Sequence, residues 1–302
     1  MSFTAFLLIV ASAGLHATWN LVAKKNRMSL PFYMIIASSC MLVWLHVQFW
    51  TPVAVSALSW KFWMTVFASV AADVLYCCGL VLSYRRMEMA TAYPVMRALP
   101  IILTALATGL FGWGKPLTGI SLVGFFIVFT GALLIPLNRL ADFRPSQYWN
   151  WNMFYILMVA CGTTGYTILD SRAQEVLAGC AEGVAAPIRS LTYYSIRGVA
   201  LCTTLGLITC FVPSCRCEFR NLIAGGQFKA GILAGMLAAL SYPLVLCAMN
   251  YVTNVSYVQV FRQLGLPIGM GLGVLFLKEH CPRIKVVGVI LILGGLAVSV
   301  MR

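Results

Sequence analysis

Three arginines and one acid lie deep inside otherwise apolar stretches of this chain. Arg97 interrupts the run TAYPVMRALPIILTAL at residues 91–106, Arg262 and Arg197 interrupt two later runs, and Asp73 interrupts an earlier one. An arginine held in hydrocarbon costs at least about 2.5 kcal/mol, so each should face a partner, water or a bound anion. Guanidinium groups bind carboxylates and phosphates through paired, charge-assisted hydrogen bonds. These residues therefore predict a buried, charged site for a small molecule.

The composition indicates that the surroundings of this site are a lipid bilayer. Of the 302 residues, 61% are hydrophobic and 10% are charged, and the mean hydropathy is +0.90, which leaves too little polar surface for a water-soluble globule. Apolar runs of about 20 residues, the length that crosses a bilayer as a helix, recur throughout. We predict ten transmembrane helices, at residues 3–23, 31–50, 61–84, 89–112, 117–137, 151–172, 186–212, 227–250, 254–277 and 284–301.

The length and continuity of these runs exclude barrel strands, which alternate lipid-facing and lumen-facing residues, so the predicted fold class is an all-α polytopic membrane protein. The apolar N-terminal run lacks a positive n-region and is expected to form the first span rather than a signal peptide. The longest connections, at residues 138–150, 173–185 and 213–226, are too short to hold a soluble domain. Any function must therefore lie among the helices.

Several classes of function are disfavoured by what the sequence lacks. It contains no H-E-x-x-H, G-x-S-x-G or Walker motif, so we expect neither an enzyme nor an ATP-driven pump, and no metal or cofactor. The net charge of +13 comes with no long basic tract, so no nucleic-acid partner is expected; membrane lipids are expected partners of a monomer or a homodimer. Cys215 and Cys217 form a lone C-x-C pair, to which we assign no role.

Basic residues are distributed unequally between the two sets of alternate loops. One set contains twelve lysines and arginines and the other five; the richer set is Lys24, Lys25, Arg27, Arg85, Arg86, Arg139, Arg144, Arg216, Arg220, Lys278, Arg283 and Lys285. Since cytoplasmic loops are enriched in these residues, the count places both termini outside the cytoplasm.

The two halves of the chain resemble each other. When Arg97 is aligned with Arg262, ATAYPVMRAL lies over VSYVQVFRQL, and further on Gly124 and Gly131 lie over Gly288 and Gly295. Five spans per repeat is an odd number of crossings, so the second half must be inverted relative to the first. We therefore predict two inverted five-helix repeats, at residues 1–140 and 141–302, with a substrate site between them near the bilayer midplane.

The chain also resembles the EamA-type family of the drug/metabolite transporter superfamily. The resemblance is carried by YRRMEMATAYPVMRALP in the first half, and in the second half by an apolar span ending in LKE, a proline shortly afterwards and a closing glycine-rich helix. It implies ten helices in two halves, cytoplasmic termini, and transport of small metabolites across the inner membrane, often outward. The termini implied by the resemblance oppose those indicated by the charge count, so the orientation remains open.

The depth of each charge suggests partners. Asp73 lies about 12 residues before the end of its span and Arg97 about 8 residues into the next, so an antiparallel pair would bring them within roughly 5 Å in depth. We therefore expect an ion pair between them. No acid occupies the equivalent position near Arg262, whose charge we expect to be met by Gln259, by backbone groups or by an anionic substrate.

Helix-breaking residues lie beside both arginines. Pro94 and Pro100 flank Arg97 in sequence, and Gly265 and Pro267 follow Arg262, as expected of interrupted helices that line a cavity. Gly265, Gly269 and Gly273 also form a smooth stripe, which close helix packing explains. Tyr93, one turn before Arg97, is assigned to the substrate site.

Two alternatives apply to these polar residues. Arg97 and Arg262 could simply bridge helices to one another, since buried ion pairs also serve packing. His16 and Trp19 lie on one helical turn. They could form a hydrogen bond that bridges helices, or His16 could titrate and Trp19 could stack on the substrate. Asp170 and Arg189, read as lying near span ends, are expected to reach the interface.

The sequence thus favours a secondary transporter of a small anionic or zwitterionic metabolite. Its predicted substrate-binding residues are Arg97, Arg197, Arg262, Tyr93, Gln259 and Trp19, and its predicted proton-coupling residues are Asp73 and His16. Two alternatives remain: multidrug efflux of lipophilic compounds, and a membrane protein without transport activity, either an enzyme or a channel.

Overall fold

A computed structural model describes residues 2–24, 29–87, 89–143, 151–277 and 280–301. Within these ranges the chain is all-helical and contains no β-strand, which confirms the predicted fold class at that level. Six helical segments are long and apolar enough to cross a membrane: Leu30–Trp50, Trp60–Ser83, Met153–Cys180, Ala186–Phe211, Phe228–Met249 and Val255–Leu275. Shorter apolar helices cover Phe3–Trp19, Val95–Leu110 and Gly119–Leu134. These features indicate a multi-pass membrane protein.

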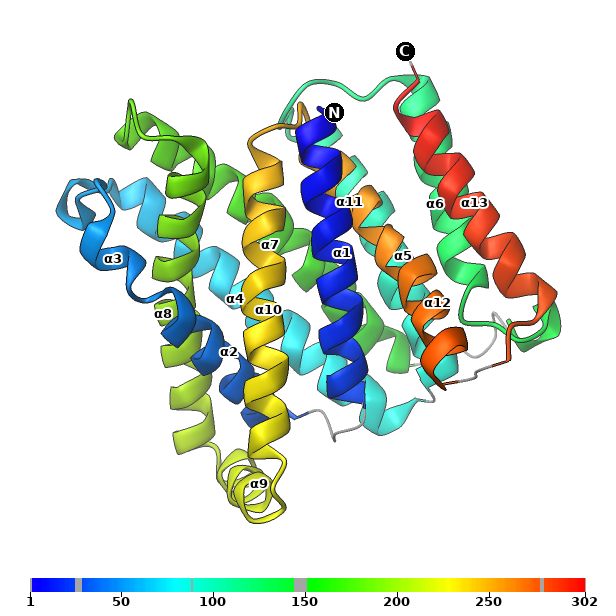
Figure 1. Cartoon of the computed structure of the whole chain (residues 1–302), viewed down its shortest axis with the longest axis horizontal. Helices are drawn as coiled ribbons and strands as arrows, with labels where there is room; N and C mark the ends of the chain where they lie inside the picture. The colour runs from blue at the N-terminus through cyan, green and yellow to red at the C-terminus, as the bar shows by residue number, and fades with distance from the viewer. Residues whose placement is uncertain (1, 25–28, 88, 144–150, 278–279, 302) are drawn as a thin grey trace.

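The helices follow one another with short connections (Figure 1). Their bounds are α1 (Phe3–Lys24), α2 (Leu30–Trp44), α3 (Val47–Trp50), α4 (Trp60–Arg86), α5 (Met89–Leu110), α6 (Gly119–Leu134), α7 (Asn152–Cys180), α8 (Ala186–Phe211), α9 (Pro213–Ala224), α10 (Phe228–Met249), α11 (Val255–Phe261), α12 (Gly265–Leu277) and α13 (Arg283–Ser299). Side-chain caps fix several starts: Ser29 begins α2, Ser59 begins α4 and Thr118 begins α6, each accepting a hydrogen bond from a backbone N–H three residues on.

Glycines allow the helices of the two halves to pack closely. A Cβ added at Gly295 of α13 would lie 2.8 Å from the Gly124 carbonyl oxygen of α6, and one added at Gly131 would lie 2.7 Å from the Gly288 carbonyl oxygen. The earlier residue of α6 thus meets the later residue of α13, so the two helices are antiparallel. They lie side by side at one edge of the molecule (Figure 1). Gly162 of α7 lies in the same way against the backbone of α4.

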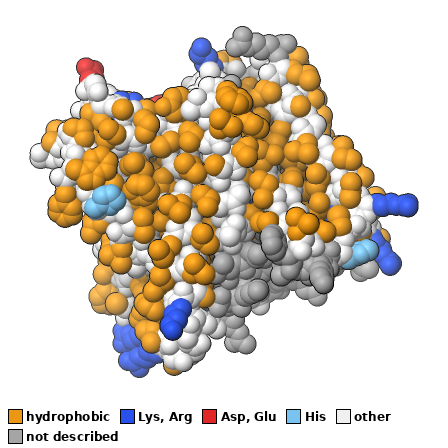
Figure 2. All heavy atoms as spheres, in the orientation of Figure 1, with side chains coloured by type: hydrophobic (Ala, Val, Ile, Leu, Met, Phe, Trp, Pro, Cys, Tyr) orange, Lys and Arg blue, Asp and Glu red, His pale blue; other side chains and the backbone are white. Residues whose placement is uncertain are grey.

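The outer surface is largely apolar. In Figure 2, hydrophobic side chains cover a broad band, and the visible lysine and arginine side chains lie at the margins of the molecule. Large side chains such as Phe49, Phe126 and Ile290 are more than half exposed. Exposed apolar surface on this scale suits contact with lipid. Both termini lie at one end of the molecule, and α9 lies at the other (Figure 1).

Three expectations about the helices require correction. The helix predicted to end at residue 172 continues to Cys180 as α7, so Asp170 lies inside it rather than near its end. Residues 213–224, expected to be a loop, form the amphipathic helix α9. The helix α5 runs unbroken through Pro94 and Pro100. By contrast, a 3₁₀ turn at Arg262–Leu264 separates α11 from α12, directly before Gly265.

Candidate functional site

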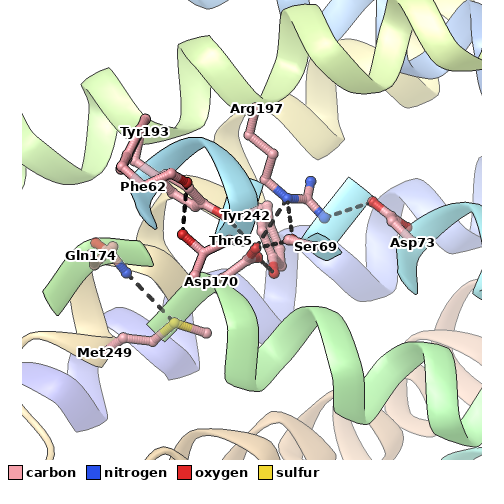
Figure 3. A network of polar contacts seen from close by, with 10 residues as sticks. All are labelled: Phe62, Thr65, Ser69, Asp73, Asp170, Gln174, Tyr193, Arg197, Tyr242 and Met249. Carbon is pink, nitrogen blue, oxygen red and sulfur yellow. Dashed lines mark hydrogen bonds and ion pairs between the residues drawn. The ribbon is translucent and has the colours of Figure 1, made fainter. Parts of the chain in front are cut away.

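Asp170 lies at the centre of a buried polar network in the middle of the helix bundle (Figure 3). Its side chain is fully buried and accepts hydrogen bonds from the hydroxyls of Ser69, Tyr193 and Tyr242 and from Nε of Arg197. Tyr193 donates over 2.6 Å and Arg197 over 3.1 Å. Donors from α4, α8 and α10 thus converge on one carboxylate of α7, which satisfies a charge that would otherwise be costly to bury.

Arg197 connects Asp170 to a second acid. Its Nε also lies 3.1 Å from Ser69 Oγ, and its Nη2 donates to Oδ2 of Asp73 over 2.8 Å. The Arg197 and Asp170 side chains are 5% and 0% exposed, whereas Asp73 is 16% exposed. One guanidinium is therefore shared between two carboxylates, and the group of three carries one net negative charge when all are ionised.

Arg262 reaches this group from the 3₁₀ turn. It contacts the same tyrosine rings as Arg197, but the described ion pairs with the two acids belong to Arg197. Its guanidinium carbon lies 5.9 Å from the centroid of the Tyr166 ring and 5.8 Å from that of Tyr242. The Arg197 guanidinium carbon lies 5.9 and 5.5 Å from the same two centroids. Nη1 of Arg262 is buried and donates to no acceptor among the described residues. The two tyrosine rings thus stabilise both cations, but one Arg262 nitrogen keeps its hydrogen-bonding capacity unused.

A cavity of about 140 Å³ lies beside these groups. Its lining includes the side chains of Asp73, Arg197, Arg262 and His16, and most of the remainder is aromatic or apolar. The aromatic residues are Trp19, Tyr33, Tyr76, Tyr166, Tyr194 and Tyr242. Trp19, which lines the cavity, belongs to the apolar cluster that also contains Leu222 of α9. The size of the cavity is close to the 150 Å³ or so that holds a benzene molecule in an engineered protein cavity.

Toward the end that carries the termini, a second polar cluster closes the bundle. Asn250 of α10 donates to Gln174 Oε1 over 3.1 Å and to Ser190 Oγ over 2.9 Å, and Gln174 donates to the Leu246 carbonyl oxygen over 3.1 Å. Gln174 lies one helical turn beyond Asp170 on α7 and also lines a separate cavity of about 220 Å³. The Asp170 network and this cluster therefore separate the two cavities.

Asp73 has a different partner from the one that the depth argument suggested. That argument paired it with Arg97 of the adjacent span, but the ion pair that the structure gives Asp73 is with Arg197 of α8. Arg97 lies farther along α5, with its guanidinium beside Gly265 of α12. Arg197 and Arg262 reach the cavity, as predicted for substrate-binding residues, whereas Arg97 is absent from its described lining.

Of the remaining predicted site residues, some line the cavity and others lie in contacts between helices. His16 and Trp19 line the cavity, and Nδ1 of His16 accepts a hydrogen bond from Nε1 of Trp19 over 3.0 Å. Gln259 instead lies in the core, where its Oε1 accepts from Thr167 over 3.4 Å. Tyr93 and Pro94 lie outside the residues whose side chains are described.

The glycine stripe of α12 faces α1. A Cβ at Gly265 would lie 3.8 Å from the Ala13 carbonyl oxygen, and one at Gly269 would lie 3.9 Å from Cβ of Ala17. Gly273 lies one further turn along the helix, and Pro267 lies within its first turn. These positions agree with a packing role for the stripe.

Asp170, Tyr166 and Tyr242 are the residues of this site that sequence reasoning missed. Asp170 was assigned to a span end, and the tyrosines carried no local signal. A longer helical reading of residues 151–180 would have shown Asp170 at mid-helix, where a charge requires partners. Among the described residues, no three His, Cys, Asp or Glu side chains gather as a metal site would require.

Comparison with known proteins identifies the fold but not the family. No protein-family model and no curated protein matches the chain. In contrast, 28 chains of solved structures match. One of them, described as "Crystal structure of protein", has a TM-score of 0.70 at 14% identity and covers 99% of this chain and 97% of its own. The arrangement of helices along nearly the whole chain is therefore similar to that of a solved protein.

Proposed function

We propose that this chain is a secondary active transporter that moves a small anionic or zwitterionic metabolite across the cytoplasmic membrane. The proposal is supported by a cavity within the bundle whose lining includes buried charges from both halves of the chain. Secondary transporters bind their cargo at such sites near the bilayer midplane. The resemblance to the EamA-type family favours the same class of function and an outward direction, in the inner membrane, as a monomer or a homodimer.

We further propose ten membrane-crossing segments in two inverted repeats, residues 1–140 and 141–302. The first repeat would contain α1, α2, α4, α5 and α6, and the second α7, α8, α10, α11–α12 and α13. Exchanging the repeats converts the α4–α7 contact into the α10–α1 contact, and both are among the most extensive in the molecule. The α2–α8 and α6–α13 contacts convert into themselves. Such reciprocal packing is what a pseudo-two-fold axis requires.

The anionic character of the cargo is supported chiefly by Arg262. Arg197 is neutralised by two carboxylates, but Arg262 faces the cavity with rings as its described contacts and with Nη1 buried and unpartnered. A carboxylate, phosphonate or similar group would supply the missing acceptor. The small volume of the cavity favours a metabolite over a drug-sized compound, whose sites typically exceed about 300 Å³.

Multidrug efflux is the second candidate, because six aromatic side chains line the cavity and Asp73 faces it. A lipophilic cation could stack on those rings. It would, however, meet the Arg262 guanidinium, for which no ion pair is described, in a setting where charges interact far more strongly than in water.

Counterflow in proteoliposomes, with cargo found by metabolite profiling of overexpressing cells, tests the proposal. Arg262→Gln should abolish transport and leave folded protein in the membrane, whereas Arg220→Gln, on the exposed face of α9, should transport normally. Normal transport by Arg262→Gln would remove the site. Resistance to cationic dyes with unchanged metabolite levels would favour multidrug efflux instead.

A further inference from the structure

The two acids that share Arg197 are held very differently. Asp170 is fully buried and accepts from three hydroxyls and one guanidinium nitrogen. Among the described residues, Asp73 accepts one hydrogen bond, from Nη2 of Arg197, and its side chain lines the cavity. Each donor to a carboxylate stabilises its ionised form. The oxygens of Asp170 are thus occupied by donors and closed off from the cavity, whereas Asp73 faces the cavity with one contact, so Asp73 is the acid placed to exchange a proton with it.

The ionised groups around Asp73 are Arg197 on α8, Asp170 on α7 and Arg262 on the 3₁₀ turn. Its other titratable neighbours are Cys77 and Tyr76 on its own helix, Cys40 and Tyr33 on α2, Tyr166 on α7, Tyr194 on α8, Tyr242 on α10 and His16 on α1. Thiols and phenols are uncharged near neutral pH, which leaves His16 as the competing proton acceptor. Protonation of Asp73 would not leave Arg197 without a counterion, because Asp170 remains in contact with it.

We propose that a proton on Asp73 and an anion at Arg262 strengthen each other's binding, so that the chain moves a proton and its cargo in the same direction. The inference rests on the proposed transport function and adds the sign of its coupling. Protonating Asp73 removes a negative charge from a cavity that also contains the anion site, and binding an anion makes that protonation more favourable in turn. A cationic cargo would reverse the sign and exchange against protons.

The strength of this coupling depends on the distance between Asp73 and an anion bound at Arg262, which the shared tyrosine rings limit. Both guanidinium carbons lie within 6 Å of the Tyr242 centroid, at 5.5 Å for Arg197 and 5.8 Å for Arg262, and Asp73 is in contact with Arg197. Unit charges roughly 10 Å apart in an effective dielectric constant of about 20 change each other's binding by about tenfold. A gradient with protons in excess outside would then drive uptake, and the outward transport implied by the family resemblance would require an outward gradient of cargo.

Calorimetry on the purified full chain in lipid nanodiscs tests the sign directly, with acetate, lactate and benzoate as probes. Titrations above pH 6 keep these carboxylates ionised, and two buffers of different ionisation enthalpy report protons taken up on binding. We expect net proton uptake and an affinity that rises about tenfold as the pH falls. Proton release, or no proton exchange, overturns the coupling, and binding of none of the three probes overturns the carboxylate site.

Matched variants identify the proton acceptor. In Asp73→Asn, the affinity should stay near the low-pH value of the wild type at every pH, without proton uptake, whereas His16→Gln should retain the uptake. Loss of uptake in His16→Gln together with its persistence in Asp73→Asn overturns the assignment to Asp73. If Asp73→Asn does not fold, the wild-type titrations still decide the sign. Counterflow of the profiled cargo is measured separately, so transport with the opposite coupling would overturn this inference and leave the proposed function standing.

Discussion

Tyr242 donates its hydroxyl hydrogen to Oδ2 of Asp170, and this bond fixes the ring on which the Arg197 and Arg262 guanidinium groups both rest. The tyrosine therefore has two separable parts. Its hydroxyl helps to satisfy the central carboxylate, and its ring contacts both cations. Conservative substitutions can remove one part without the other.

Tyr242→Phe should keep anion binding and lower stability. The phenylalanine ring retains the contact with both cations, but Asp170 loses one donor, a change that costs about 1–3 kcal/mol for a buried charged acceptor. Tyr242→Leu should weaken anion binding as well. Thermal unfolding and benzoate titration of both variants provide the measurement. Tyr251→Phe, at a half-exposed residue outside the site, should change stability by less than about 0.5 kcal/mol.

Asp170→Asn should destabilise the chain by about 3–5 kcal/mol, since it removes one member of a buried ion pair and replaces one of the two acceptor oxygens with an NH2 donor. The matched control is Glu175→Gln on the same helix, where the ion pair with Arg172 is exposed and contributes little. Thermal unfolding of the two variants compares them. Equal stability of both would mean that Asp170 is not the centre of the network.

The helices could be predicted largely because membrane-spanning length and apolar composition are local properties. The exception is instructive, since the predicted span stopped at residue 172. Asp170 and Arg172 lower the local hydropathy, yet the helix continues to Cys180, because most of residues 173–178 are good helix formers, among them Ala173, Glu175 and Leu177. Asp170 is buried because Ser69 and Tyr242 supply donors from 101 and 72 residues away. A single stretch of sequence cannot show such partners.

The partner of Asp73 illustrates a second limit. Depth along two neighbouring spans can be counted from the sequence, but the direction in which each side chain points around its helix depends on how the helices pack. Arg197 reaches Asp73 from a third helix, α8, and the two side chains are in contact at the cavity wall. The helix interruption at Arg262, by contrast, could be predicted from the nearby Gly265 and Pro267. The structure has a 3₁₀ turn at Arg262–Leu264.

Gly295→Ala should destabilise the chain by about 1–3 kcal/mol, because the added methyl group would lie 2.8 Å from the Gly124 carbonyl oxygen and cannot be accommodated without moving α6. Its neighbour provides the control. A Cβ at Gly294 meets nothing within 4 Å, so Gly294→Ala should be neutral or slightly stabilising, since alanine favours helix. Thermal unfolding distinguishes the two; indistinguishable melting temperatures would contradict close packing of α6 on α13.

The orientation of the chain can be read from two exposed cysteines at opposite ends of the bundle. Cys217 lies on α9, and Cys180 ends α7 shortly before α8 crosses back toward α9. Because α9 also contains Arg216 and Arg220, the positive-inside rule predicts that it faces the cytoplasm.

A variant that retains Cys217 alone should react with a membrane-impermeant maleimide only after the cells are opened, and one that retains Cys180 alone should react in intact cells. The reverse pattern would place the termini in the cytoplasm, as the family resemblance implies. Cys215 offers an internal check on the same helix, because burial and the Glu218 carboxylate raise the pKa of its thiol. Less of it is thiolate at neutral pH, so a Cys215-only variant should label more slowly than the Cys217-only variant, and its labelling should accelerate as the pH rises. Equal rates at neutral pH would contradict the burial of Cys215.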